Sequence, residues 1–296
     1  MKAKWGKAWA VLGVVLGLST TLTVQAVPNA VVETVQSPAW VERAGQRLPL
    51  AAGMALKNRD RLLTGEGARV IVHLADGSAF RIGENSVLTV NAMQQGKNGV
   101  FVGALDLKAG DLRLVSHEFA EAPVKRSINV RFGQLTAAVR GEADITGTAE
   151  GARDSVTLRD GKAVFMHPLM AAMEIDTPLQ VVQASPNKVP ESAAAVDRFQ
   201  GAAWALRTQP LYDAATQQSW GRWMLRFGVF DKPAALALFD QLREAGFSSQ
   251  IQPVRVQGGQ RYELRLPNLV GEHEAQRLAE RLSSALSLPV AAVIKR

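Results

Sequence analysis

The sequence feature that most constrains the fold is a unit near the C-terminus that occurs twice. "LRFGVFDKPAALALFDQLREAG" spans residues 225–246, and "LRLPNLVGEHEAQRLAERLSSAL" spans residues 264–286. Each copy begins with alternating apolar and polar residues, which indicates a half-buried strand, and continues into an apolar stripe at helical spacing. One copy alone leaves its stripe uncovered, so two copies that share one sheet explain the repetition.

The two helical stripes occupy matching positions. Ala235, Leu238, Leu242 and Ala245 each have a counterpart 40 residues later, at Ala275, Leu278, Leu282 and Ala285. Asp231 fits an N-cap and Gly246 fits a C-terminal stop. The strand-like runs "SSQIQPVRV" and "PVAAVI" follow the helices. We therefore predict an α+β ferredoxin-like (βαββαβ) domain over residues 221–296, with two helices on one face of an antiparallel sheet.

Residue parity assigns the two faces of this predicted sheet. The helix-covered face takes Trp223, Leu225, Phe227, Tyr262, Leu264 and Leu266, and the open face takes Met224, Arg226, Glu263 and Arg265. RNA-recognition domains of this topology place aromatic residues on the open face to stack bases. Here the aromatic residues fall on the covered face, which argues against RNA binding.

Residues 221–296 resemble the SPOR family, through "RWMLRFGVFDKPAALALFDQLREAGF", "RYELRLPNLVG" and the second helix. The resemblance implies binding to peptidoglycan glycan strands from which the peptides have been removed. Arg226 and Val229 replace the Gln and Ser of the family, Glu263 lies near its Arg position, and Gly228 and Phe230 match. The candidate glycan-binding residues are Met224, Arg226, Val229, Phe230, Glu263 and Arg265. Alternatively, Arg226 and Glu263 only pair across strands on a solvated face.

Residues 30–167 consist of short β-like runs separated by Gly and Asp. Asp76-Gly77 and Asp160-Gly161 lie between such runs and predict hairpins with type I′ turns. A further reversal is expected around Gly110-Asp111. This spacing predicts an all-β N-terminal domain, either a sandwich or β-solenoid-like.

The same region resembles the FecR family. The resemblance rests on "LAAGMALKNRDRLLTGEGARVIVHLADGSAFRIGENSVLTV", "VGALDLKAGDLRL" and "AAVRGEADI", although Glu142 stands where the family has Thr. It implies a β-rich periplasmic module used in sensing or scaffolding, and no chemistry. Arg140 is a candidate ligand contact, but we favour a structural role for it at a strand end.

Residues 168–220 are rich in proline and are predicted to be a linker with one helix, between Pro190 and Pro210. The polar segment "TQQSWGR" is expected to be flexible. At the other end of the chain, residues 1–26 combine three lysines, an apolar run and Val24-Gln25-Ala26, which is typical of a secretory signal peptide. The predicted location is the periplasm, and an uncleaved inner-membrane anchor is the alternative.

The composition gives no sign of an enzyme. The four histidines are not at metal-ligand spacing, and the chain has no cysteine, so we expect no metal and no cofactor. The scattered acidic residues leave a glycosidase carboxylate pair open, but both resemblances are to non-enzymes, so we expect no catalysis. The net charge of +7 falls to +4 without the signal lysines, which does not require nucleic acid as a partner.

These features together predict a multidomain periplasmic binding protein. Its C-terminal domain would bind peptidoglycan glycan strands and its β domain an envelope protein, with a role in cell division. The alternative is a periplasmic signalling or scaffold module that binds only proteins.

The order of lysines, apolar run and small residues predicts cleavage after Ala26. N-terminal sequencing of the protein from a periplasmic extract should therefore begin at Val27. Recovery of Met1 in a membrane fraction would favour the anchor instead.

Overall fold

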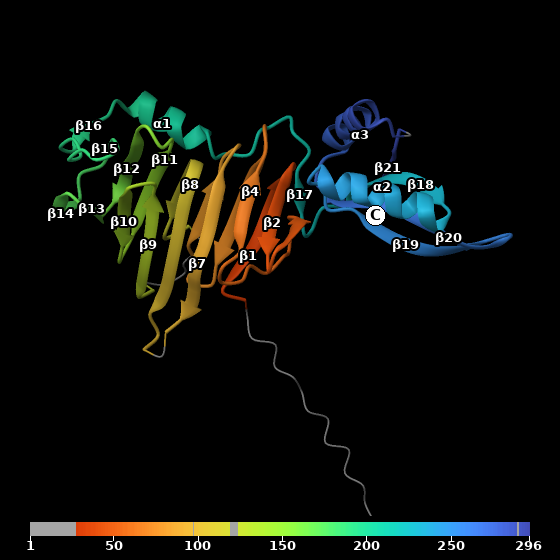
Figure 1. Ribbon diagram of the computed structural model, residues 1–296, viewed down its shortest axis with the longest axis horizontal. Coiled ribbons are helices and arrows are strands. Elements are labelled where there is room, and N and C mark those ends of the chain that lie inside the picture. The colour runs from red at the N-terminus through yellow and green to blue at the C-terminus, as the bar shows by residue number, and fades with distance from the viewer. Residues whose placement is uncertain (1–27, 97, 119–123, 289) are drawn as a thin grey trace, which may run out of the picture.

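The computed structural model describes residues 28–96, 98–118, 124–288 and 290–296, and it consists mainly of strands (Figure 1). The predicted signal peptide, residues 1–26, lies outside these described residues. None of the helices in the described part of the chain is both long and apolar enough to cross a membrane.

Most strands belong to two sheets. The first sheet contains, in spatial order, β16 (Ala194–Ala195), β15 (Gln180–Ala184), β12 (Asp154–Gly161), β11 (Ala143–Ala149), the second half of β8 (Phe101–Val115), β6 (Ala79–Ile82), β5 (Arg69–Leu74), β1 (Ala30–Gln36) and β17 (Gln217–Gln218). The second contains β3 (Gln46–Pro49), β2 (Ala39–Arg43), β4 (Arg61–Thr64), β7 (Val87–Gln95), the first half of β8, β9 (Arg126–Phe132), β10 (Leu135–Val139), β13 (Ala163–His167) and β14 (Met170–Ile175). Among these pairs, only β8 and β9 run parallel.

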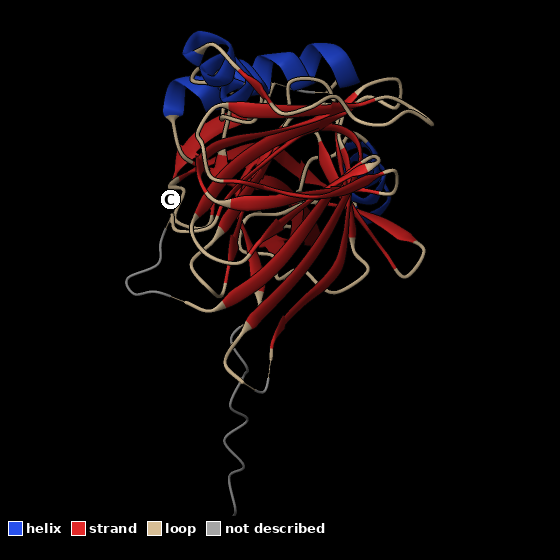
Figure 2. Cartoon of the chain, turned by 90° about the vertical axis from the view of Figure 1, so that its left-hand side faces the viewer, coloured by secondary structure: helices blue, strands red, loops and turns tan. Residues whose placement is uncertain are grey.

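The two sheets enclose one hydrophobic core. Val70 and Val72 from the first sheet and Leu105 and Leu107 from the second belong to the same buried cluster. Their alternation along each strand places every second side chain inside. Of the two predicted arrangements, this is the sandwich. Figure 2 looks along the row of strands and shows the helices outside them.

Strand β8 passes from one sheet to the other at Gly110. Residues 101–109 pair with β7, and residues 110–115 pair with β11. Gly110 has φ +88°, and a Cβ there would lie 2.7 Å from the Cα of Ser86, so only glycine fits. The predicted reversal at Gly110-Asp111 is therefore wrong, because the strand continues and changes sheets.

The two predicted Asp-Gly hairpins have different outcomes. The hairpin at Asp76-Gly77 is confirmed by the pairing of β5 with β6, but only Gly77 has positive φ, so the turn is not type I′. The prediction of a hairpin at Asp160-Gly161 is wrong, because β12 and β13 lie in different sheets. A Cβ on Gly161 would collide with the backbone of Glu142, which explains the glycine at this crossing.

The sandwich continues beyond the predicted boundary at residue 167. Strand β14 pairs with β13, β15 pairs with β12, and Ala194–Ala195 pair with β15. Residues 168–195 are therefore part of the sheets rather than a linker. The predicted helix is α1 (Arg198–Leu206), which begins later than expected because Ala194 and Ala195 pair with β15. Asp197 caps the helix by accepting a 2.6 Å hydrogen bond from the Phe199 amide.

The repeated unit forms strands β18 (Trp223–Phe230), β19 (Gln250–Val256), β20 (Gly259–Leu269) and β21 (Ala292–Lys295) and helices α2 (Lys232–Glu244) and α3 (Glu272–Leu286). The strand order is β21-β18-β20-β19, and all pairs are antiparallel. The stripes of both helices bury against Leu225, Phe227, Leu264 and Leu266 in a second core, although Ala285 is exposed. Asp231 caps α2 by accepting a hydrogen bond from the Ala234 amide, as predicted.

The sandwich and the repeated unit are joined by residues 207–218, which we call the junction strap. Its β17 pairs with β1 of the sandwich and with β20 of the repeated unit, so the expected flexibility of "TQQSWGR" is wrong. Gln36 at the end of β1 is only 1% exposed. Its amide donates to Leu211 O, Ala214 O and Thr216 Oγ1 and accepts from the Leu211 amide, at 2.7–3.4 Å.

Replacing Gln36 by Ala should loosen the junction strap and lower the free energy of unfolding. A buried backbone group that loses its partner costs about 1–3 kcal/mol. Hydrogen exchange should accelerate in residues 208–218 while β8 stays protected. Gln260→Ala, at an exposed site, is the matched control; equal exchange in the two variants would show that Gln36 does not hold the strap.

Candidate functional site

The predicted glycan-binding residues lie on both faces of the C-terminal sheet. Arg226 and Arg265 are directly opposed on β18 and β20, and Val229 is opposed to Glu263. These four and Met224 lie on the open face. Phe230 does not: it pairs with Tyr262 and packs partly against the helix-covered core. A bulge between Arg226 and Gly228 shifts the register of β18, which counting along the strand could not anticipate.

The open face is centred on an ion-paired cluster of one carboxylate and two guanidinium groups. Glu263 is 1% exposed and forms ion pairs with both Arg226 and Arg265. A sugar needs polar groups with unused hydrogen-bonding capacity, whereas this carboxylate is already held between two guanidinium groups. The pairing alternative therefore describes Arg226 and Glu263 better than a glycan floor does, and Arg265 joins them.

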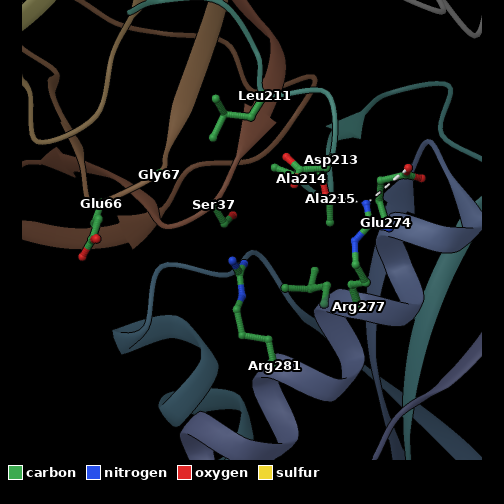
Figure 3. A pocket seen from close by; sticks show the side chains of 11 residues that line it. Ser37, Glu66, Gly67, Leu211, Asp213, Ala214, Ala215, Glu274, Arg277 and Arg281 are labelled. Atoms are coloured by element: carbon green, nitrogen blue, oxygen red, sulfur yellow. Dashed lines mark hydrogen bonds and ion pairs between the residues drawn. The ribbon is translucent and has the colours of Figure 1, made fainter.

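A cleft of about 320 Å³ lies where the sandwich, the junction strap and α3 meet, and we call it the junction cleft (Figure 3). Its walls are formed by Ser37, Glu66 and Gly67 of the sandwich, by Leu211, Asp213, Ala214 and Ala215 of the strap, and by Glu274, Arg277, Leu278 and Arg281 of α3. Its volume is within the range of small-ligand sites. Because its walls come from all three, the cleft depends on how the two parts of the chain are held together.

The two arginines of the cleft have different surroundings. Arg277 donates to Asp213 O at 2.7 Å and lies 3.6 Å from a carboxylate oxygen of Glu274. Arg281, one helical turn later, forms no hydrogen bond or ion pair with any described residue, and Figure 3 shows its guanidinium group directed toward Ser37. Of the two arginines in the cleft, Arg281 is thus the one without a partner among the described residues.

A second contact supports the junction from the α2 side. The indole of Trp40 donates to Arg243 O at 3.2 Å, and the Ala39 amide donates to Gly246 O at 3.3 Å. Arg47 stacks over the Trp40 ring with its guanidinium carbon 4.2 Å from the centroid. Contacts on two sides of the strap restrict rotation of the repeated unit against the sandwich.

Sequence reasoning missed the junction residues. Gln36 and its strap partners are separated by 175–180 positions, and no local pattern connects them. Only Arg277 and Arg281 left a signal, because their i, i+4 spacing places them together on one exposed side of a helix.

The other singled-out residues have structural partners. Arg140 donates to Val139 O at 3.1 Å and to Asn129 Oδ1 at 3.0 Å, in keeping with a structural role at a strand end. His73 lies 2.7 Å from Glu33, and His167 accepts from the Leu169 amide. Across the described residues, no group of His, Asp and Glu side chains is arranged to hold a metal ion.

The charge cluster on the open face predicts a specific pattern of stability changes. Replacing both Arg226 and Arg265 by Ala should lower the free energy of unfolding by about 3 kcal/mol, the lower end of the range for breaking a buried pair, because both arginines are partly solvated. Adding Glu263→Gln should recover most of the loss, since the uncompensated charge is removed.

Chemical denaturation would measure both changes. Arg255→Ala with Arg261→Ala, at exposed sites without an ion pair to the described residues, is the matched control. A double variant as stable as this control would mean that Glu263 does not depend on its two arginines.

Comparison with known proteins supports one of the two resemblances. A family model described as "FecR protein" matches residues 60–164, a little more than a third of the chain. The match ends well before residue 221, so the SPOR resemblance stays a prediction. No curated protein sequence matches the chain.

Two crystal structures of a "putative anti-sigma factor" from Parabacteroides distasonis ATCC 8503 are similar to the chain. Both are 16% identical to this chain and match 64% of its length. The match covers 76% of the first structure, with a TM-score of 0.39, and 75% of the second, with a TM-score of 0.38. What the comparisons establish is therefore a FecR-like region within the sandwich.

Proposed function

We propose that this chain is a non-enzymatic signalling or scaffold module of the cell envelope that binds proteins, with the surface around the junction cleft as its docking site. The observation that carries the proposal is the fixed junction: Gln36 and β17 hold the sandwich and the repeated unit in one orientation. A surface formed by two parts of the chain is then present before a partner arrives, so less conformational freedom is lost on binding.

The exposed side chains of this region suit a protein partner. Tyr212 in the junction strap is 100% exposed, Leu211 is 38% exposed, and Trp220 just after the strap is 63% exposed. Tyrosine and tryptophan contribute strongly to protein interfaces, because they combine a large apolar surface with a polar group. Tyr212 lies between Leu211 and Asp213, which both line the cleft, and this position favours docking there.

The FecR-like region supports the signalling part of the proposal. The match to residues 60–164 covers the centre of the sandwich, and the FecR resemblance implies sensing or scaffolding without chemistry. The signal-peptide pattern at residues 1–26 supports a position in the periplasm.

The domain division and the fold of the second part belong to the proposal as well. Two separate cores favour two domains, with the sandwich reaching to about residue 206 and the second domain beginning near residue 221. The strand order β21-β18-β20-β19, with α2 and α3 on one face, supports a ferredoxin-like arrangement.

Glycan binding is the rival function, and the burial of Glu263 and the orientation of Phe230 disfavour it. Glu263 is buried between Arg226 and Arg265, and Phe230 faces away from the open side. A role in cell division rested on glycan binding alone and loses its support with it.

Photo-crosslinking in intact cells tests protein docking at the junction. A benzoylphenylalanine in place of Tyr212 should give a discrete covalent adduct with one envelope protein, whereas the same group at Gln257, in the β19–β20 turn, should not. The adduct should weaken in the Gln36→Ala background, because the strap no longer fixes the surface.

Sedimentation with amidase-treated sacculi tests the rival. The full-length protein should remain in the supernatant. If it sediments, and if Arg226→Ala with Glu263→Gln and Arg265→Ala abolishes sedimentation, the glycan function replaces the one proposed here.

A further inference from the structure

The junction cleft combines one uncommitted cation with uncommitted anions. Arg281 has no hydrogen bond or ion pair with a described residue, whereas the nearby Arg277 is held by Asp213 O and Glu274. Figure 3 shows Arg281 reaching from α3 across the cleft toward Ser37. A guanidinium group has five N–H donors in a planar fork, which matches the two oxygens of a carboxylate.

Ser37 brings a second polar group to the same end of the cleft. It lines the cleft from the sandwich side, and its hydroxyl, buried in this rotamer, has no hydrogen-bond partner among the described residues. A hydroxyl can rotate to donate to an incoming acceptor. Ser37 and Arg281 belong to opposite walls, so one carboxylate can engage both parts of the chain.

The rim of the cleft is acidic. Glu66 and Asp213 are exposed and form no ion pair within the described residues, while Glu274 is offset by Arg277. A multiply charged anion such as phosphate is repelled by these carboxylates. A ligand that carries an ammonium group besides its carboxylate is attracted by them.

The remaining lining is small and aliphatic. Leu211, Ala214, Ala215 and Leu278 form the apolar part of the walls, and the volume of about 320 Å³ is at the lower end for small-ligand sites. Short aliphatic side chains fit this space and match its small aliphatic lining.

We infer that the junction cleft binds the carboxylate of a short peptide with small side chains, with Arg281 and Ser37 at the carboxylate and Glu66 and Asp213 near the ammonium group. The inference rests on the proposed function, because it names the chemistry recognised at the docking surface. Binding to both walls also stabilises the junction, since a ligand that favours the assembled arrangement shifts the equilibrium toward it.

Trialanine with free termini is the probe, and isothermal titration calorimetry with the full-length protein is the measurement. We expect saturable binding in the micromolar to millimolar range. C-terminal amidation of the probe should weaken binding by about tenfold to a hundredfold, because the hydrogen bonds from a charged group are lost. N-acetylation should weaken it by a smaller factor, since Glu66 and Asp213 are exposed.

The variants separate the role of Arg281 from effects on folding. Arg281→Ala should weaken trialanine binding as much as amidation does, and it should leave the binding of the amidated probe unchanged. Its melting temperature without ligand should match that of the wild type, because Arg281 has no partner among the described residues. Arg255→Ala, an exposed arginine on β19, is the control and should bind like the wild type.

Three results would each overturn the inference: no saturable binding of trialanine, equal binding of the amidated probe, or displacement by inorganic phosphate at equal concentration. The crosslinking at position 212 distinguishes failure of this inference from failure of the proposed function. If the adduct forms but trialanine does not bind, docking remains and the peptide chemistry is wrong. If no adduct forms, the docking function itself is wrong.

Discussion

The arrangement of the protein depends on one buried side chain, Gln36. Its amide satisfies backbone groups of Leu211 and Ala214 and the hydroxyl of Thr216, all in the strap that leads to the repeated unit. Buried backbone groups have to be paired, so the strap is held where Gln36 can reach it. Strand β17 is then placed between β1 and β20, and the sheet continues from one part of the chain into the other.

The junction cleft follows from this constraint. Its walls come from the sandwich, the strap and α3, and none of these elements forms the cleft alone. Arg281 has no partner there among the described residues, while Arg226 and Arg265 on the open sheet face both pair with Glu263. The contrast between the two places is one of pairing, since Arg226 and Arg265 share an acidic partner and Arg281 has none among the described residues.

Local patterns predicted the elements of the repeated unit well. The stripe of α2, the cap at Asp231 and the buried parity of Leu225 and Leu264 depend on residues a few positions apart. The candidate site was predicted less well, since five of its six residues share the open face but Phe230 does not. The register shift at the bulge before Gly228 depends on the pairing of β18 with β20, which is a property of two strands.

Periodicity and capping act within a few residues, so the sequence located the strands and helices of the repeated unit and the apolar side of each, although it missed the strands within residues 168–195. Strand pairing depends on contacts between distant segments, so it could be seen only in the folded chain. Asp76-Gly77 and Asp160-Gly161 carry the same local signal, yet one closes a hairpin and the other crosses between sheets. The cleft also depends on distant segments, since packing and hydrogen bonds between them bring Ser37 and Arg281 together, and the sequence showed only the i, i+4 spacing of Arg277 and Arg281.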